Sequence, residues 1–138
     1  MNERENIGVV KKLLDAVGKG DMQAMVDVLA DDVEWQSPVT RTEHKGITWS
    51  RERHGREEVL GFFSELSQKS KIEPFEEMKF TAQDDRVVIE GKNRGSARGT
   101  SKPYEHNWIM VFDLQGGKIV KHRHYYDTAD IESAFLLG

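Results

Sequence analysis

The sequence of 138 residues contains no cysteine and only three prolines. The absence of cysteine excludes disulfide bonds, thiolate catalysis and cysteine-ligated zinc. Long apolar runs are absent too, and charged residues are scattered through the first dozen positions, so we expect neither a signal peptide nor a membrane span. These absences predict a cytoplasmic protein that has no membrane partner.

An excess of basic charge is also missing, because 24 acidic residues outnumber 20 basic ones and the formal net charge is −4. This balance gives no reason to expect a nucleic acid partner. The chain is 37% hydrophobic and 9% aromatic, which is enough for one core, whereas two domains of this total length would each be small. We therefore expect a single domain over residues 1–138.

Apolar residues spaced by three and four positions predict three helices in the first half of the chain. The first covers residues 6–17, and the second is a short helix after Asp21 with Leu29 on its apolar face. The third covers residues 56–68 and has an unusually aromatic face. A short C-terminal helix is expected after Asp127, which has the chemistry of an N-cap.

Alternating apolar and polar residues predict five strands, at 33–37, 74–82, 86–94, 104–113 and 118–126. The segment 39–55 has no sustained period and is expected to form a long loop, and residues 95–101 are expected to form a flexible turn. The order of elements predicts an α+β fold with helices on one side of a curved, mostly antiparallel sheet.

The last two predicted strands carry their aromatic residues and imidazoles on one face, because alternate strand residues point to opposite sides. The inward positions are Tyr104, His106, Trp108, Met110 and Phe112, followed by Val120, His122, His124 and Tyr126. Three imidazoles in a purely structural core would be costly unless each were hydrogen-bonded. This face therefore indicates a ligand site, with a structural, hydrogen-bonded histidine as the alternative at each position.

Acid–base chemistry is the first role that these residue types favour. His106 or His124 could act as a general base near neutral pH, and Tyr126 or Tyr104 could donate a hydrogen bond to a developing oxyanion. The carboxylate of Asp127 could orient either histidine, although N-capping of the last helix explains the same residue without catalysis.

The histidine pair and the basic loop were considered as possible sites for a metal and for an anionic partner, and neither is favoured. The pattern His122-x-His124 lacks the spacing of known zinc motifs, so we expect no metal and no other cofactor. Basic residues in and beside the 39–55 loop, including His44, Lys45 and Arg53, are diluted by acidic neighbours. The single tryptophan of that loop, Trp49, should bury its ring over a pocket mouth or in a subunit contact.

Three stretches resemble the nuclear transport factor 2-like superfamily, in its SnoaL-like and ketosteroid-isomerase-like branch. They are GDMQAMVDVLADDVEWQSP, HGREEVLGFF and NWIMVFDLQGGKIVKHRHYYD. With the first helix they cover nearly the whole chain. The resemblance implies a cone-shaped fold in which a bent sheet wraps around a deep pocket capped by helices, and it implies a homodimer.

The resemblance also implies that the steroid isomerase mechanism is absent. At the three positions that hold the general-base Asp, the oxyanion-hole Tyr and the protonated Asp of that enzyme, this chain has Ser37, Leu13 and Trp108. Polyketide cyclases of the superfamily use an Asp with a nearby His. Only His106, His124 and Asp127 could offer comparable chemistry here.

We therefore expect a pocket for a small hydrophobic or carbonyl-bearing molecule, with cofactor-free chemistry of the isomerase, cyclase, dehydratase or hydrolase type. The expected catalytic residues are His106, His124, Tyr126 and Asp127. The expected ligand-binding residues are Leu13, Trp35, Ser37, Trp49, Phe63, Tyr104, Trp108, Met110 and His122. The alternative is a non-catalytic module of the same fold that binds a small ligand or dimerises.

Overall fold

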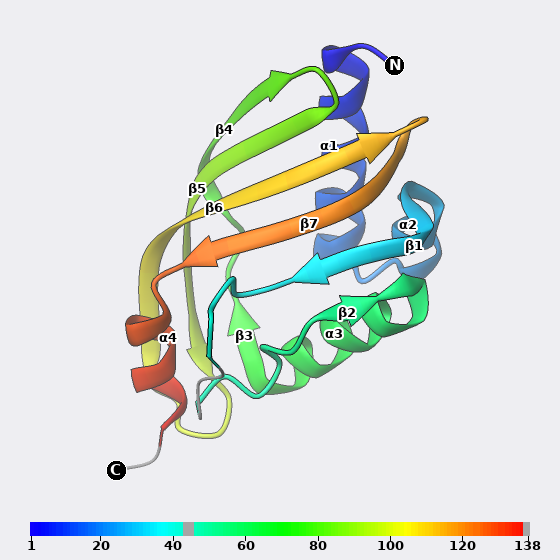
Figure 1. Cartoon of the computed structure of the whole chain (residues 1–138). Helices are drawn as coiled ribbons and strands as arrows, with labels where there is room; N and C mark the ends of the chain where they lie inside the picture. Colours follow the sequence, from blue (N-terminus) through cyan, green and yellow to red (C-terminus); the bar gives the residue numbers. More distant parts are fainter. Residues whose placement is uncertain (43–45, 137–138) are drawn as a thin grey trace.

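The computed structural model describes residues 1–42 and 46–136 and confirms the α+β prediction. A strongly curled sheet forms a half-barrel with helices packed against it and at one end (Figure 1). The described elements are α1 (Glu3–Lys19), α2 (Met22–Val28), β1 (Leu29–Gln36), β2 (Arg53–His54), α3 (Gly55–Lys69), β3 (Ser70–Ile72), β4 (Glu76–Gln83), β5 (Arg86–Ala97), β6 (Pro103–Gln115), β7 (Lys118–Tyr126) and α4 (Thr128–Phe135).

The sheet is mostly antiparallel, as expected, with the order β2-β1-β7-β6-β5-β3 and with β4 also paired to β5. Only the β1–β7 pair among these strands is parallel. Strand β5 holds two partners on one side because it is long enough to pair with β4 near its start and with β3 at its end. The curl brings the two ends of the sheet around a common interior.

Several of the predicted boundaries differ from the structure. Residues 95–97 do not belong to a flexible turn but continue β5 and pair with β3. Gly95 occurs there because a Cβ atom would collide with the backbone of Lys71 and lie 2.6 Å from the hydroxyl oxygen of Tyr104. The glycine therefore marks a close approach and not a turn. Leu29 begins β1 instead of belonging to the second helix. The strands β2 and β3 were not predicted, because strands of two or three residues are too short to show an alternating pattern.

Helix α1 is longer than its apolar pattern because the caps that bound it lie beyond that pattern at both ends. Asn2 and Glu5 form a capping box, in which Asn2 Oδ1 accepts from the backbone N–H of Glu5 at 2.8 Å. At the other end Gly20 adopts a left-handed conformation and ends the helix.

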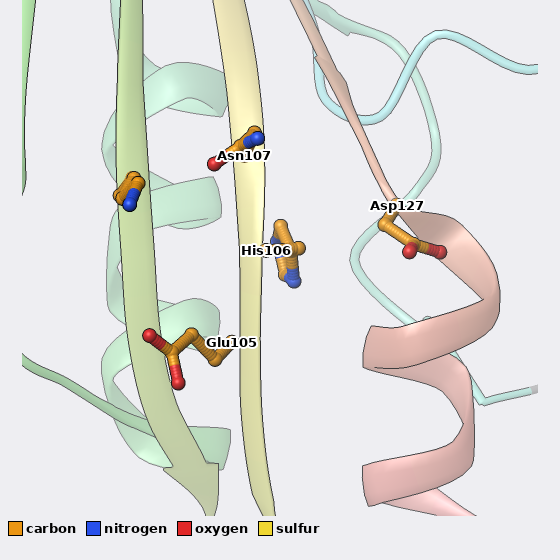
Figure 2. Close-up of a pocket in the computed structure, with 5 residues that line it drawn as sticks. Glu105, His106, Asn107 and Asp127 are labelled. Atoms are coloured by element: carbon orange, nitrogen blue, oxygen red, sulfur yellow. The ribbon is translucent and has the colours of Figure 1, made fainter.

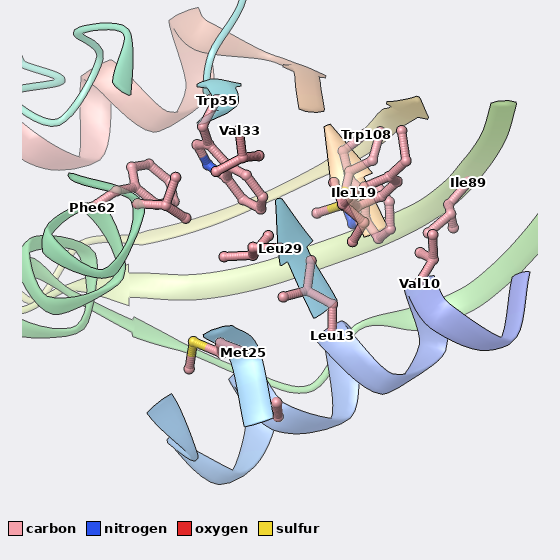
Figure 3. Packing of buried hydrophobic residues seen from close by; sticks show 14 of the residues in the cluster. Val10, Leu13, Met25, Leu29, Val33, Trp35, Phe62, Ile89, Trp108 and Ile119 are labelled. Atoms are coloured by element: carbon pink, nitrogen blue, oxygen red, sulfur yellow. The ribbon is translucent and has the colours of Figure 1, made fainter. Parts of the chain in front are cut away.

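The core lies between the helices and the inner face of the sheet. Helix α1 contacts β4, β5 and β7, and α3 contacts β1, β2 and β3, so α3 lies across the two ends of the curl. Figure 3 shows Val10 and Leu13 of α1 pointing toward the sheet, and Trp35 beside Phe62 of α3. Aliphatic and aromatic side chains bury most of the inner face of the sheet.

The predicted alternation of β6 is confirmed, because its even-numbered residues from Tyr104 to Leu114 are buried. Strand β7 follows the prediction only from His122 onward. A bulge at Asp113 and Leu114 shifts the register of the two strands, so that Ile119 is fully buried and Val120 is only partly buried. The expectation that Val120 points inward is therefore wrong.

The ring of Trp108 lies close to the backbone of β5 at Gly91, its partner in the sheet. A Cβ atom at position 91 would lie 2.6 Å from Cζ2 of Trp108, closer than atoms in contact can approach. We predict that Gly91→Ala lowers the free energy of unfolding by about 2 kcal/mol, because the buried ring must move. Urea denaturation measures this change.

The matched control is Gly99→Ala, since no atom lies within 4 Å of a Cβ built at Gly99. Its effect should be small. Equal loss of stability in the two variants would contradict the close packing of Trp108 on β5.

Candidate functional site

His106 lies where β6 extends beyond the end of β7. The last pair between these strands joins Trp108 to Tyr126, and the chain then enters α4. Helix α4 therefore replaces a strand beside this end of β6 (Figure 1). Asp130 of α4 binds the uncovered edge, where its Oδ2 accepts from the backbone N–H of Glu105 and from His106 Nδ1, both at 2.9 Å. The carboxylate thereby fixes the orientation of the imidazole.

The carboxylate on His106 thus belongs to Asp130, which the sequence analysis missed, and not to Asp127. Asp127 is exposed and acts as the N-cap of α4, with Oδ1 accepting from the backbone N–H of Asp130 at 3.0 Å. N-capping was one of the two roles expected for Asp127. A sequence signal for Asp130 exists, because a second Asp three residues after an N-cap lies in the first helical turn and can face the preceding strand.

An open hollow of about 460 Å³ lies between this end of β6 and the start of α4 (Figure 2). It is lined by Lys92, Glu105, His106, Asn107 and Asp127. A neighbouring open hollow of about 680 Å³ is lined in part by Tyr104 and Asp130. Two expected catalytic residues therefore border a hollow, whereas the enclosed aromatic pocket stays a prediction.

His124 is held by a network of side chains from distant parts of the chain. Its Nδ1 lies 3.2 Å from Ser37 Oγ. The indole N–H of Trp49 donates to the hydroxyl oxygen of Tyr126 at 3.2 Å. Burial raises the pKa of Tyr126 to about 12, and burial together with the nearby His106 lowers the pKa of His124 to about 3. Both groups are therefore neutral at pH 7.

His122 is the most completely buried of the three inward histidines, at 2% exposure. Its ring is stacked on Trp35 with 3.7 Å between centroids, and its centroid lies 4.7 Å from that of Phe112. Burial lowers its pKa well below the usual value of 6.5, so the ring stays neutral.

The structure brings the expected polar rings together in one row along the inner face. Neighbouring centroids are 5.9 Å apart for His122 and His124, 4.7 Å for His124 and Tyr126, and 5.6 Å for Tyr126 and His106. The row continues to Tyr104 at 5.7 Å from His106. The Tyr104 hydroxyl is hydrogen-bonded to Ser70, and burial raises the pKa of Tyr104.

Comparison with known proteins shows the family to which the chain belongs. The model of the SnoaL-like domain matches residues 10–122. This chain belongs to the SnoaL-like family. Among curated proteins none matches the sequence.

Solved structures show the same fold for this SnoaL-like chain. An NTF2-like protein from Burkholderia xenovorans LB400 is 26% identical, with a TM-score of 0.87 and 99% of each chain covered. A protein provisionally named a polyketide cyclase, from Xanthomonas campestris pv. campestris, is 20% identical with a TM-score of 0.81, covering 99% of this chain and 100% of that one. A hypothetical protein with a ketosteroid isomerase-like fold from Catenulispora acidiphila DSM 44928, in complex with trimethylamine, is 18% identical, with a TM-score of 0.74 and coverages of 94% and 93%.

The remaining residues expected to bind a ligand line the interior of the SnoaL-like domain. Leu13 and Met110 are buried in the core, and Phe63 meets the edge of Trp35 with 5.3 Å between ring centroids. Trp49 is 1% exposed within its own chain and packs edge-on against Phe135 of α4 at 4.8 Å. Its ring therefore covers the end of the domain near Tyr126 and is not left for a subunit contact.

Several polar atoms on the inner face of this SnoaL-like domain are buried without a hydrogen-bond partner among residues 1–42 and 46–136. They are Trp35 Nε1, Trp108 Nε1, Asn93 Oδ1, His106 Nε2, His124 Nε2 and both ring nitrogens of His122. Unpaired buried polar atoms are rare and costly in folded proteins. Their concentration on one face is the strongest structural sign of a binding site.

Three of the basic residues in and beside the 39–55 loop lie near acidic side chains. Arg51 and Arg53 both lie near Glu65, and Arg56 pairs with Asp31 at 2.5 Å. His44 and Lys45 lie outside the described residues.

Across the same described ranges, no helix is both long and apolar enough to cross a membrane. No group of three or more histidine, cysteine or acidic side chains in these ranges could hold a metal ion.

Proposed function

We propose that this SnoaL-like domain binds a small, largely apolar, carbonyl-bearing molecule against the inner face of its sheet and moves a proton on it without a cofactor. The observation that carries the proposal is the His106–Asp130 pair, with 2.9 Å between Nδ1 and Oδ2. The other ring nitrogen of His106 is buried and has no partner in the described chain.

The direction of this hydrogen bond decides what His106 can do. An ionised carboxylate only accepts, so Nδ1 of His106 donates to Asp130. In the neutral ring the proton on Nδ1 leaves a lone pair on Nε2. A histidine with one nitrogen oriented by a carboxylate and the other free is the arrangement of a general base.

The surroundings favour a largely apolar ligand. The rings of Trp35 and Trp108 and the side chain of Met110 lie on the same face as His106 and are almost completely buried. Apolar walls with a few convergent polar groups are typical of small-molecule sites. One structural relative is provisionally named a polyketide cyclase and another was solved in complex with trimethylamine, and both names agree with a site for a small molecule.

The mechanism would differ from that of steroid isomerases. Ser37 and Leu13 replace an acid and a tyrosine of that site, and neither can take their roles. A base on β6, supported from α4, would take the place of the missing carboxylate.

Hydrogen exchange on a simple ketone tests the proposal without knowledge of the natural ligand. 1-Tetralone joins an apolar bicyclic body to a carbonyl with exchangeable α-protons. In D2O, proton NMR should show faster loss of the α-proton signal with the protein than with buffer alone.

A non-catalytic binding module is the second candidate. It is favoured because the hydroxyls of Tyr126 and Ser37 are already bonded within the protein. Binding of 1-tetralone without faster exchange would support this candidate, and the absence of both binding and exchange would contradict the proposed ligand site.

The homodimer implied by the resemblance stays a prediction. Ile109 and Tyr125 are opposite partners on the outer face of β6 and β7 and are 39% and 42% exposed. Such a pair would suit contact with a second copy of the chain.

A further inference from the structure

Residues 37–52 form a long connection between two strands that pair directly. Strands β1 and β2 are antiparallel neighbours, with Trp35 opposite Arg53. A turn of about two to five residues usually joins such a pair, and loops longer than about 12–15 residues are often lids or binding loops. The connection carries residues 46–50, which we call the Trp49 segment, to a position beside α4 (Figure 1). The extra length therefore serves to cover this end of the domain.

The Trp49 segment is buried although it belongs to neither a helix nor a strand. Ile47 and Trp49 are each 1% exposed. The ring of Trp49 packs edge-on against Phe135 of α4, and its indole N–H donates to the hydroxyl oxygen of Tyr126 at 3.2 Å. The segment thus contacts both α4 and the end of β7.

Few hydrogen bonds hold this segment in place. In residues 1–42 and 46–136, the bond from Trp49 to Tyr126 is the one that joins it to the sheet. Another, from the backbone N–H of Ser50 to the carbonyl oxygen of Ile47, lies within the segment itself. Parts of a protein with few hydrogen bonds to the fold open locally at a lower free energy than core strands do.

The candidate base cannot meet a ligand unless part of its cover moves. His106 borders the hollow of about 460 Å³, but its Nε2 is buried, as is Nε2 of His124. Both rings lie next to Tyr126, to which Trp49 is bonded. Helices α1 and α3 contribute buried residues to the core. The Trp49 segment is therefore the part of the cover that opens at the least cost.

We propose that the Trp49 segment is a lid, which opens from α4 and Tyr126 to admit the ligand to the inner face and then closes over it. Trp49 holds the lid closed through its hydrogen bond to β7 and its ring contact with α4. Closure excludes water from the base, as lids do in many enzymes. The inference rests on the proposed function for the ligand, whereas the opening is a property of the free protein.

Native-state hydrogen exchange measures the opening without a ligand. The indole N–H of Trp49 should exchange by local opening, with a protection factor at least about tenfold lower than that of the Phe112 backbone amide and with little dependence on urea. Phe112 is fully buried in the β5–β6 pair and reports global unfolding. The same urea dependence at both groups would show that the segment opens only when the domain unfolds, and this result would overturn the inference.

A reversible disulfide bond can hold the lid closed. A Cβ atom built at Gly46 lies 2.9 Å from Cγ of Glu132 in α4, a separation that a disulfide between cysteines at these two positions allows. The chain has no cysteine of its own, so Gly46→Cys/Glu132→Cys can form only this bond within one molecule. The reduced variant is the matched control, because it carries both substitutions without the crosslink.

Oxidation of this variant should slow the association of 1-tetralone at least about tenfold relative to the reduced form. Stopped-flow tryptophan fluorescence measures the association rate. Oxidation should also raise the protection of the Trp49 indole N–H toward that of the Phe112 amide, which corrects for any change in global stability. Equal association rates in the two forms would contradict a lid at this position.

Trp49→Phe tests how the lid is held closed. Phenylalanine keeps an aromatic ring against Phe135 and removes the N–H that bonds to Tyr126, so the lid should open more often. We expect 1-tetralone to associate about threefold faster or more. A merely structural role of Trp49 would lower the stability of the domain and leave the association rate unchanged.

The lid and the proposed function fail in different ways. If 1-tetralone binds and the crosslink does not slow its association, the ligand site stands and the lid is wrong. If 1-tetralone binds to neither the wild-type protein nor the variants, the proposed function is contradicted. The exchange of the Trp49 indole N–H then still decides whether the segment opens.

Discussion

The SnoaL-like domain is expected to lose stability as the pH falls from 7.5 to 5.0, with His124 alone contributing about 2 kcal/mol. The pKa of His124 is lowered to about 3 in the folded protein, and that of His122 is also well below 6.5. Between the unfolded and the folded pKa the unfolded chain binds protons that the folded chain does not bind. Stability is therefore fully present above about pH 6.5 and is lost as the pH falls toward 3.

Urea denaturation at several pH values measures this loss. His124→Gln removes the titrating group and keeps an amide that can hydrogen-bond to Ser37, so the free energy of unfolding should depend less steeply on pH. The matched control is His54→Gln, because His54 is solvent-exposed. A wild-type protein that is equally stable at pH 7.5 and 5.0 would show that the inward histidines are not buried as neutral rings.

The second large effect is expected at His106. His106→Gln should reduce the protein-catalysed α-proton exchange of 1-tetralone by about 100-fold or more, because the imidazole that Asp130 orients is lost. Asp130→Asn should cause a loss of similar size, since the asparagine amide can donate to Nδ1 and leave the proton on Nε2. The affinity for 1-tetralone should change little in either variant, because neither change alters the apolar walls.

The control for Asp130 is its neighbour in the same helical turn. Asp127→Ser keeps an N-cap for α4 and removes the carboxylate, so exchange should proceed at the wild-type rate. If exchange slowed as much in Asp127→Ser as in Asp130→Asn, the assignment of the orienting role to Asp130 would be wrong. Unchanged exchange in a folded His106→Gln variant would exclude His106 as the base.

The sequence could predict the inner face because strand alternation is a local property. The even-numbered residues of β6 follow a period of two without interruption, and His122 and Trp35 follow the same rule. The prediction failed at Val120 because a bulge inserts one residue into the register, and nothing in the alternation of a single strand reveals its partner.

The contacts that define the candidate chemistry could not be predicted in the same way. Ser37 and His124 are 87 residues apart, and Trp49 and Tyr126 are 77 apart. These pairs form only when the segment after β1 lies beside the end of β7, where the backbone N–H of Val39 donates to the carbonyl oxygen of His124. Asp130 acts on His106 because α4 replaces a strand beside β6, which depends on where β7 ends.

The SnoaL-like fold itself leaves the reaction open, because functional groups are placed on a shared framework. In this chain Ser37 and Leu13 stand where the resemblance places an acid and a tyrosine of the steroid isomerase site. We propose instead that His106, oriented by Asp130, is the base that takes a proton from a carbon next to a carbonyl.

A crystal structure of the domain with 1-tetralone tests this central claim most directly. We predict that the ligand lies against the inner face with its α-carbon facing His106 Nε2. A ligand bound outside the inner face, or one whose α-carbon faces away from His106, would contradict it.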